Sequence, residues 1–272
     1  MTDEEFLRIV RFLKSNYGID MSRKKPIVQG RLENYFKSSG YKSYSDYMDA
    51  MEKDVTGNLE KKLVNLLSTN HTYFMREPEH FTYLKQEVLP WLKRKEERSK
   101  DLRIWCGASS TGEEPYTLAM ILMDYFGLEH GAWDTKVLAT DISTYVMQHA
   151  VIGLYTTEQV EVLPENWKRR FFRKIMNQEV YRVTDELKKE VIFRKFNLMD
   201  PFPFRKRLHV VFLRNVMIYF DERTKRELVH KIYEAMEPGG YLFIGQTETI
   251  SKEGCEFEMV RPSIYRKKEG RN

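Results

Sequence analysis

A run of small residues between an apolar strand and a helix constrains this chain more than any other feature. Residues 102–106 read as a short buried strand, and residues 107–112, Gly-Ala-Ser-Ser-Thr-Gly, read as a loop. A helix then begins at Glu113 and Glu114, with Pro115 in its first turn, where a missing N–H costs nothing. Strand, glycine-bearing loop and helix together form a ligand crevice in open α/β sheets. A plain strand-to-helix connection is the alternative, and the paired acids favour a site.

The two carboxylates at this helix start indicate the charge of the ligand. A phosphate site uses bare backbone N–H groups, often with a lysine, and the chain has no G-x-x-x-x-G-K-S/T motif. The loop is not G-x-G-x-x-G either, which argues against NAD. Acidic side chains repel phosphate but favour a ligand with hydroxyls and positive charge. S-adenosylmethionine (SAM), with ribose hydroxyls, an ammonium and a sulfonium, is such a ligand.

Strands and helices alternate through the rest of the chain, which predicts a Rossmann-like α/β fold with a mostly parallel sheet. Residues 136–140 form the second strand and end in Asp141, where this class of fold contacts ribose hydroxyls. A turn-forming aspartate is the alternative. The apolar run 209–213 predicts a central strand. The side chains that follow it at the same edge are Arg214, Asn215 and Tyr219.

Two segments depart from this alternation. Residues 160–190 contain clustered aromatic residues and a strand at about 179–183, so we interpret them as a small β insert on the main sheet. The sequence Pro-Gly-Gly at 238–240 predicts a turn before a strand over 241–245.

The N-terminal part predicts a small all-helical domain. Residues 2–5, Thr-Asp-Glu-Glu, form a capping-box pattern, and apolar residues then recur at helical spacing as far as Gly18. Further helices are expected at about 26–37, 43–53 and 59–69. The chain thus divides into a helical domain over residues 1–75 and an α/β domain over residues 76–272.

Basic residues flank the second of these helices: Arg23, Lys24, Lys25, Arg31 and Lys37. A solvated helix face and a docking surface for an acidic helix explain this pattern equally well.

The linker between the two domains, residues 68–77, contains three polar candidates. Crevices between domains often bind ligands. Asn70 and Thr72 are suited to capping helices, and Arg76 to an ordinary ion pair with Glu77 or Glu79. Alternatively, Arg76 orients a carboxylate through a two-pronged hydrogen bond.

Composition limits the remaining function classes. The net charge of +5 fits an acidic protein partner as well as nucleic acid. The sequence lacks a strong basic stripe interleaved with aromatic residues, which argues against RNA. Cys106, Cys255 and the six histidines lack the spacing of disulfide frameworks or zinc sites, so no metal is expected. No apolar run has signal or transmembrane length, which predicts a soluble cytoplasmic protein. We expect a monomer, because no apolar helix stripe is left unassigned.

Four stretches of the chain resemble the CheR family of bacterial chemoreceptor glutamate methyltransferases. They are TNHTYFMRE at 69–77, STGEEPY at 110–116, ATDI at 139–142 and RNVMIYFD at 214–221. The resemblance covers nearly the whole chain, including the helical N-terminal domain. It implies SAM-dependent methylation of glutamate carboxylates in the cytoplasmic helices of receptors. The implied products are glutamyl 5-methyl esters and S-adenosylhomocysteine.

The resemblance also implies roles for particular residues. Cofactor contacts fall on Asn70, Thr72, Arg76, Glu114, Asp141, Asn197, Leu198, Arg214 and Asn215. It favours Glu114 over Glu113, between which spacing alone does not choose. Arg76 and Tyr219 match residues near the transferred methyl group. In this family, Arg23, Lys24, Lys25 and Arg31 are expected to steer glutamate-rich receptor helices.

The residue types agree with this chemistry. A glutamate carboxylate is already ionised near neutral pH, so a strong general base is not needed. Catalysis is then expected from in-line alignment of carboxylate oxygen, methyl and sulfur. The alternatives are a SAM-dependent methyltransferase acting on another protein, RNA or a small molecule, and a non-catalytic module that senses SAM.

A last expectation concerns a tether. Some family members bind a receptor's C-terminal pentapeptide through the β insert, with a long loop that contains glycine. The corresponding residues 173–180 are few and lack glycine, which predicts an enzyme independent of that tether.

Overall fold

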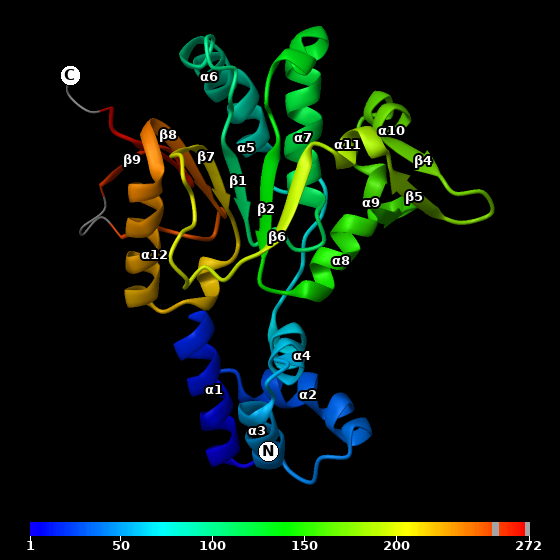
Figure 1. Ribbon diagram of the computed structural model, residues 1–272, viewed down its shortest axis with the longest axis vertical. Helices are drawn as coiled ribbons and strands as arrows, with labels where there is room; N and C mark the ends of the chain where they lie inside the picture. Colours follow the sequence, from blue (N-terminus) through cyan, green and yellow to red (C-terminus); the bar gives the residue numbers. More distant parts are fainter. Residues whose placement is uncertain (252–255, 270–272) are drawn as a thin grey trace.

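The computed structural model describes residues 1–251 and 256–269, so Cys255 lies outside the described residues. A helical bundle forms one end of the elongated molecule, and a sheet covered by helices forms the other (Figure 1). The N-terminus lies in the bundle (Figure 1).

The bundle contains α1 (Asp3–Tyr17), α2 (Lys25–Ser39), α3 (Tyr44–Lys53) and α4 (Asn58–Leu67). Thr2 and Glu5 form the predicted capping box, and Gly18 ends α1 with φ +70°. The apolar residues of α1 at helical spacing are all buried: Phe6, Ile9, Val10, Leu13 and Tyr17. They pack with Val28, Leu32, Leu63 and Leu67 into a core of their own, which confirms the all-helical prediction.

The main sheet has seven strands in the order β6-β2-β1-β7-β8-β10-β9. The strands are β1 (Ile104–Gly107), β2 (Val137–Asp141), β6 (Val191–Lys195), β7 (Leu208–Leu213), β8 (Met236–Ile244), β9 (Phe257–Arg261) and β10 (Ile264–Lys267). The first five in this order are parallel, and β10 is antiparallel to β8 and β9. The prediction of a mostly parallel sheet with a central strand at 209–213 is therefore confirmed.

Helices cover both faces of the sheet (Figure 1). One face packs on α5 (Pro78–Tyr83), the π-helical η1 (Leu84–Val88), α6 (Leu89–Lys95) and α7 (Glu113–Phe126), with the 3₁₀ turn η2 (Gly127–Ala132) after α7. The opposite face packs on α12 (Glu222–Ala235). Side chains alternate accordingly, because Ile104 and Cys106 of β1 join the first core and Trp105 joins the second. Among residues 1–251 and 256–269, no helix has the length and apolar character needed to cross a membrane.

The expected β insert forms a second, three-stranded sheet beside α8 (Thr144–Ile152). Its strands are β3 (Leu154–Thr156), β4 (Phe172–Lys174) and β5 (Val180–Val183), in the order β3-β5-β4. Its helices are α9 (Thr157–Glu161), α10 (Glu165–Phe171) and α11 (Asp185–Lys188). The insert starts before residue 160, because Gly153 ends α8 at φ +66° and the chain enters β3 at once.

The turn predicted at 238–240 is wrong, because β8 runs through these residues. Leu208 pairs with Met236 and Val210 with Tyr241, so the extra residues form a bulge within the strand. Gly240 is required there, since a Cβ would lie 2.8 Å from the His209 carbonyl oxygen.

Candidate functional site

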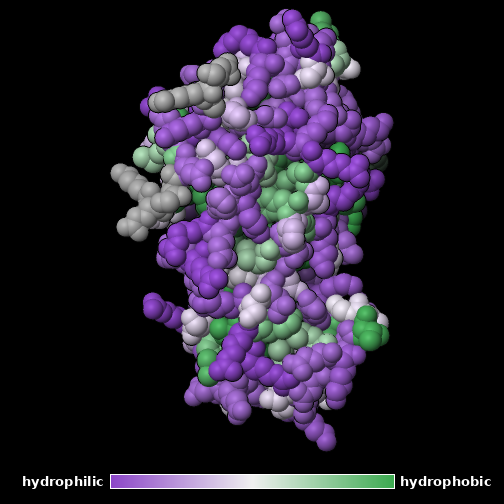
Figure 2. Space-filling model, turned by 60° about the vertical axis from the view of Figure 1, so that its left-hand side comes forward, coloured by the Kyte–Doolittle hydropathy of each residue, from purple (hydrophilic) through white to green (hydrophobic). Residues whose placement is uncertain are grey.

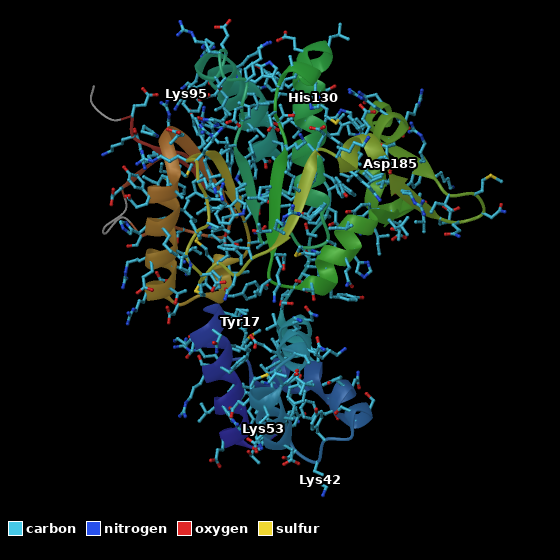
Figure 3. All side chains as sticks on the ribbon, viewed as in Figure 1. Tyr17, Lys42, Lys53, Lys95, His130 and Asp185 are labelled. Carbon is cyan, nitrogen blue, oxygen red and sulfur yellow. The ribbon has the colours of Figure 1, made fainter. Side chains whose placement is uncertain are left out.

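A cleft with about 990 Å³ of empty space, part of it open to solvent, separates the helical bundle from the carboxyl edge of the sheet. Tyr17, at this junction in Figure 3, lines its bundle side together with Ile19 and Met21. Every residue predicted as cofactor-binding or catalytic lines it: Asn70, Thr72, Arg76, Glu114, Asp141, Asn197, Leu198, Arg214, Asn215 and Tyr219. The structure thus brings together residues that are far apart in the sequence, in a space suited to a small molecule.

The surface around this junction is not uniformly polar. Figure 2 shows a largely hydrophilic exterior, with hydrophobic side chains gathered in hollows along the middle of the molecule. The cleft itself combines apolar side chains such as Phe196 and Phe220 with the polar residues above. An apolar lining with a few placed polar groups is typical of a cofactor site.

The two loop glycines serve packing. A Cβ at position 107 would lie 2.8 Å from the Leu213 Cδ1, and Gly112 combines φ +99° with a Cβ position 2.8 Å from the Ala150 Cβ. The loop residues on the cleft are instead Ala108, Ser109 and Ser110. Glycine is therefore required at both positions by packing against neighbouring side chains and, at position 112, by the positive φ.

Asp141 organises the loop as well as lining the cleft. Its Oδ2 accepts a hydrogen bond from the Ser110 backbone N–H at 2.9 Å, and its Oδ1 accepts one from Ser143 at 2.8 Å. Burial raises the pKa of Asp141, and these backbone donors oppose that rise. Asp141 therefore forms the turn and also lines the cleft, and its contact with ribose hydroxyls stays a prediction.

The two acids at the start of α7 have different surroundings. Glu113 is buried and its carboxylate accepts hydrogen bonds from the Thr111 hydroxyl and the Gln159 amide. Burial raises the pKa of Glu113. Glu114 lines the cleft and pairs with Arg214 at 2.6 Å. Of the two acids, therefore, Glu114 and not Glu113 lies on the cleft.

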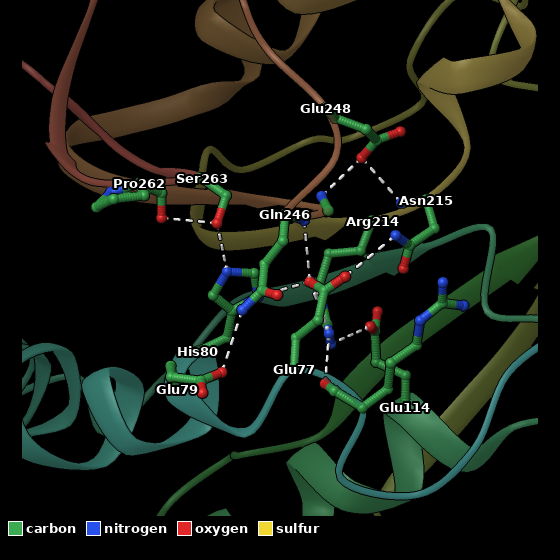
Figure 4. A network of polar contacts seen from close by, with 12 residues as sticks. Glu77, Glu79, His80, Glu114, Arg214, Asn215, Gln246, Glu248, Pro262 and Ser263 are labelled. Atoms are coloured by element: carbon green, nitrogen blue, oxygen red, sulfur yellow. Dashed lines mark hydrogen bonds and ion pairs between the residues drawn. The ribbon is translucent and has the colours of Figure 1, made fainter.

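Arg214 lies at the centre of a buried polar network below the cleft (Figure 4). Its side chain is 1% exposed and pairs with Glu114 and, at 3.1 Å, with Glu77. It also donates to the Arg76 carbonyl oxygen. Burial alone would raise the pKa of Glu77, but Arg214 and the Asn215 amide outweigh it and lower that pKa. Arg214 therefore pairs with two carboxylates and holds Glu114 in place.

Glu77 is a site residue that sequence reasoning missed. Its Oε1 accepts a hydrogen bond from the Asn215 Nδ2 at 3.2 Å, and its Oε2 accepts one from the Gln246 backbone at 3.2 Å. Its backbone has φ +55°, which is strained for glutamate. The available signal is its place between Arg76 and Pro78 in the linker motif, although the sequence alone suggests Glu77 only as an ion-pair partner for Arg76.

Arg76 is not paired as the ion-pair alternative predicted. Its guanidinium donates to the His71 carbonyl oxygen at 2.8 Å and lies 5.7 Å from the centre of the Tyr73 ring. Glu77 pairs with Arg214, and Glu79 accepts from Gln246. Within the described part of the chain, no carboxylate lies at ion-pair distance from Arg76. Its positive charge is thus available to the cleft.

Helix α1 and the segment that follows it meet the sheet edge at the loops that carry Tyr219 and Asn197. The Tyr219 carbonyl oxygen, in η3 (Met217–Tyr219), accepts from the Asp20 N–H at 2.8 Å. The Asn197 side chain donates to the Asn16 carbonyl oxygen at 2.8 Å. The Lys24 ammonium lies 5.2 Å from the centre of the Tyr219 ring. The basic flank of α2 therefore reaches the cleft.

Arg31 differs from the other basic residues of this flank. It donates to the carbonyl oxygens of Leu67 and Ser68 at 2.7 and 3.1 Å, and to the Thr69 hydroxyl at 2.8 Å. Arg31 therefore caps the end of α4 and anchors the linker. Lys25 pairs with Asp3 at 2.6 Å, and Arg23 is exposed.

The buried polar network around Arg214 contains a histidine, His80, which predicts that the stability of the protein depends on pH. His80 is 2% exposed and its Nε2 lies 2.7 Å from the Ser263 hydroxyl. Burial, with the nearby Arg214 charge, lowers the pKa of His80 to about 4. The unfolded chain binds a proton near pH 6.5 that the folded chain binds only near pH 4. The free energy of unfolding therefore falls as pH drops through this window, by about 2–3 kcal/mol for this group.

Urea unfolding at pH 7 and pH 4.5 measures this loss. His80→Gln is expected to reduce the difference between the two pH values, leaving a part due to the similarly buried His209, whose pKa burial also lowers to about 4. His149→Gln, on the exposed side of α8, is the matched control and should keep the full difference in the free energy of unfolding between the two pH values. An undiminished difference in the His80 variant contradicts the prediction.

The residues of the cleft fit SAM. Carboxylates at Glu114 and Asp141 suit hydroxyls and cationic groups, and the apolar residues suit a purine ring. The start of α7 carries acids where a phosphate site has bare N–H groups. Among residues 1–251 and 256–269, no group of three or more His, Cys, Asp or Glu is arranged to hold a metal ion.

Comparison with known proteins gives a family. A model described as "CheR methyltransferase, SAM binding domain" matches residues 70–265, and one described as "CheR methyltransferase, all-alpha domain" matches residues 4–68. A chemotaxis protein methyltransferase of Borreliella burgdorferi is 38% identical, over 98% of this chain and 95% of its own length. That of Escherichia coli is 34% identical, over 97% and 91%. Chemotaxis protein methyltransferase 1 of Pseudomonas aeruginosa is 33% identical, over 98% of each chain.

Proposed function

The chain belongs to the CheR family of SAM-dependent methyltransferases, and on this premise we propose that it methylates glutamate side chains of chemoreceptors. The products are glutamyl 5-methyl esters and S-adenosylhomocysteine, and the modification serves sensory adaptation. The observation that carries the proposal is Arg76, whose guanidinium faces the cleft without a carboxylate partner among the described residues. An acidic substrate side chain supplies that partner.

We propose that SAM is held by the residues that line the cleft and match the family motifs. They are Asn70, Thr72, Arg76, Glu114, Asp141, Asn197, Leu198, Arg214 and Asn215. When bound, SAM supplies a methyl group carried on a sulfonium sulfur. The bundle residue Tyr17 and the apolar side chains around it close the cleft on one side and exclude water.

Arg76 and Tyr219 are the proposed catalytic residues. Both line the cleft, and Tyr219 lies beside Lys24 of the basic flank of α2. Arg76 binds and orients the substrate carboxylate, and Tyr219 shapes the methyl-transfer pocket. Because the carboxylate is already ionised, these residues act by alignment and charge rather than by proton transfer.

Residues 1–75 form the proposed receptor-docking domain and residues 76–272 the methyltransferase domain. Docking uses Arg23, Lys24, Lys25 and Arg31, of which Arg31 also anchors the linker. We propose that the protein acts as a monomer in the cytoplasm, where the receptor helices lie.

Charge reversal tests this docking surface. Arg23→Glu combined with Lys24→Glu is expected to lower kcat/KM for receptor methylation about 10-fold or more at low salt, because charge complementarity speeds association. The affinity for S-adenosylhomocysteine, measured by calorimetry, should stay unchanged. Lys42→Glu combined with Lys53→Glu makes the same charge change at the far end of the bundle (Figure 3) and should have little effect. Equal effects of the two pairs contradict a specific docking surface.

We propose that the enzyme does not depend on a receptor pentapeptide tether bound at the β insert. Its hairpin joins β4 to β5 through residues 175–179, with Asn177 at φ +60° taking the position that glycine often fills. Calorimetry with a receptor C-terminal pentapeptide is expected to detect no micromolar binding.

The proposed reaction is tested with labelled SAM and receptor fragments in which each candidate glutamate is replaced by glutamine in turn. Methyl esters release methanol in mild alkali, whereas N-methyl groups do not. A SAM-dependent methyltransferase of another protein, RNA or a small molecule is the alternative function. Alkali-stable label, or no label on any receptor fragment, favours that alternative.

A further inference from the structure

The loop after β7 presents Asn215 and Tyr219 to the cleft through an irregular backbone. Asn215 has φ +58°, in the left-handed region, and the single 3₁₀ turn η3 follows at once. Asparagine tolerates this region better than most residues, but the conformation still requires support from its surroundings. Backbone N–H groups in such a turn lack the partners that a strand or a long helix provides.

A buried carboxylate from a distant part of the chain supplies those partners (Figure 4). Glu248, in the loop after β8, is 6% exposed. Its Oε2 accepts hydrogen bonds from the N–H groups of Asn215 at 2.8 Å and Gly245 at 2.6 Å, and its Oε1 accepts one from Ile218 at 3.2 Å. Within residues 1–251 and 256–269, Glu248 has no ion pair with a lysine, arginine or histidine. Backbone donors therefore offset part of its desolvation, although burial still raises the pKa of Glu248.

Two neighbours complete the arrangement. At position 245 a Cβ would lie 2.4 Å from the Asn215 Nδ2 and 2.9 Å from the Glu248 Oε2, so only glycine leaves room for the contact. Glu77 holds the Asn215 side chain through its Oε1. Asn215 is thus fixed at both its backbone and its side chain by carboxylates from two different loops.

We propose that Glu248 is a positioning residue for the cleft. Its carboxylate fixes the backbone that presents Asn215 and Tyr219, and thereby sets the affinity for the cofactor and the rate of methyl transfer. Glu248 does not itself line the cleft, so it acts through the loop rather than by contact with a ligand. The inference depends on the proposed function only for the roles of Asn215 and Tyr219.

Glu248→Gln tests this role. Glutamine keeps the size of the side chain but turns one acceptor into an NH₂ group that faces backbone donors. The Kd for S-adenosylhomocysteine, measured by calorimetry where circular dichroism shows a folded protein, is expected to rise about 10- to 100-fold. Glu227→Gln, on the exposed side of α12, is the matched control and should change the Kd less than about 2-fold. A lower melting temperature with an unchanged Kd overturns the proposal, because a merely structural role predicts that result.

Gly245→Ala is a second variant that reaches the same loop without removing the Glu248 charge. Its methyl group displaces Asn215 and crowds the Glu248 carboxylate, so the Kd for S-adenosylhomocysteine is again expected to rise. Combined with Glu248→Gln, it should add little, because both changes act through one backbone position. Fully multiplicative effects overturn the proposal. Since S-adenosylhomocysteine binding needs no receptor, failure of receptor methylation and failure of this inference give different results.

Discussion

Arg76→Ala is expected to lower kcat/KM for receptor methylation about 100-fold. The guanidinium is the proposed carboxylate-orienting group, and misplacement of a reacting group by about 1 Å costs a factor of that size. Its only polar contacts among the described residues are local, to the His71 carbonyl oxygen and the Tyr73 ring. The loss should therefore appear in the kinetics and in S-adenosylhomocysteine affinity, with little change in the free energy of unfolding.

Two further variants make this result specific. Arg76→Lys keeps the charge but loses the planar fork, so it should restore only part of the activity. Arg11→Ala, on the exposed side of α1, removes one positive charge away from the cleft and should retain wild-type kinetics. Wild-type rate and affinity in Arg76→Ala would rule out the assignment.

Arg214→Met is expected to have the largest effect on stability. The change leaves the carboxylates of Glu77 and Glu114 without their cation in a site where the arginine is 1% exposed. Breaking a buried ion pair by removing one partner costs about 3–5 kcal/mol. Urea denaturation of wild type and variant measures the difference in the free energy of unfolding.

The matched control for this prediction is Arg223→Met on α12. Arg223 pairs with Glu227 at 2.8 Å, but its side chain is 83% exposed, so the loss should stay below about 1 kcal/mol. Adding Glu77→Gln to Arg214→Met should recover part of the stability, because it removes one of the unpaired charges. Equal losses of unfolding free energy in Arg214→Met and Arg223→Met would show that the buried ion pairs stabilise the fold no more than the exposed pair does.

Much of the fold follows from local patterns. The capping box at Thr2 and the apolar spacing of α1 predict a helix and its buried face, because both depend on residues a few positions apart. The alternation of strands and helices likewise predicts the parallel sheet. The bulge in β8 was missed because local turn propensity at 238–240 is overridden by pairing with β7.

The sequence by itself determined which residues gather at the cleft. Three of the four motifs lie at the carboxyl ends of parallel strands, which meet at one sheet edge, and the fourth lies in the linker between the domains. Only the tertiary structure decided which of these residues are buried, which face the cleft and which partners they contact. It buries Glu113 and exposes Glu114 to the cleft, pairs Glu77 with Arg214 rather than Arg76, and places Glu248 behind Asn215. These distinctions depend on contacts between residues more than thirty positions apart, as from Asn215 to Glu248. Burial and charge pairing of that kind exist only once the chain has folded.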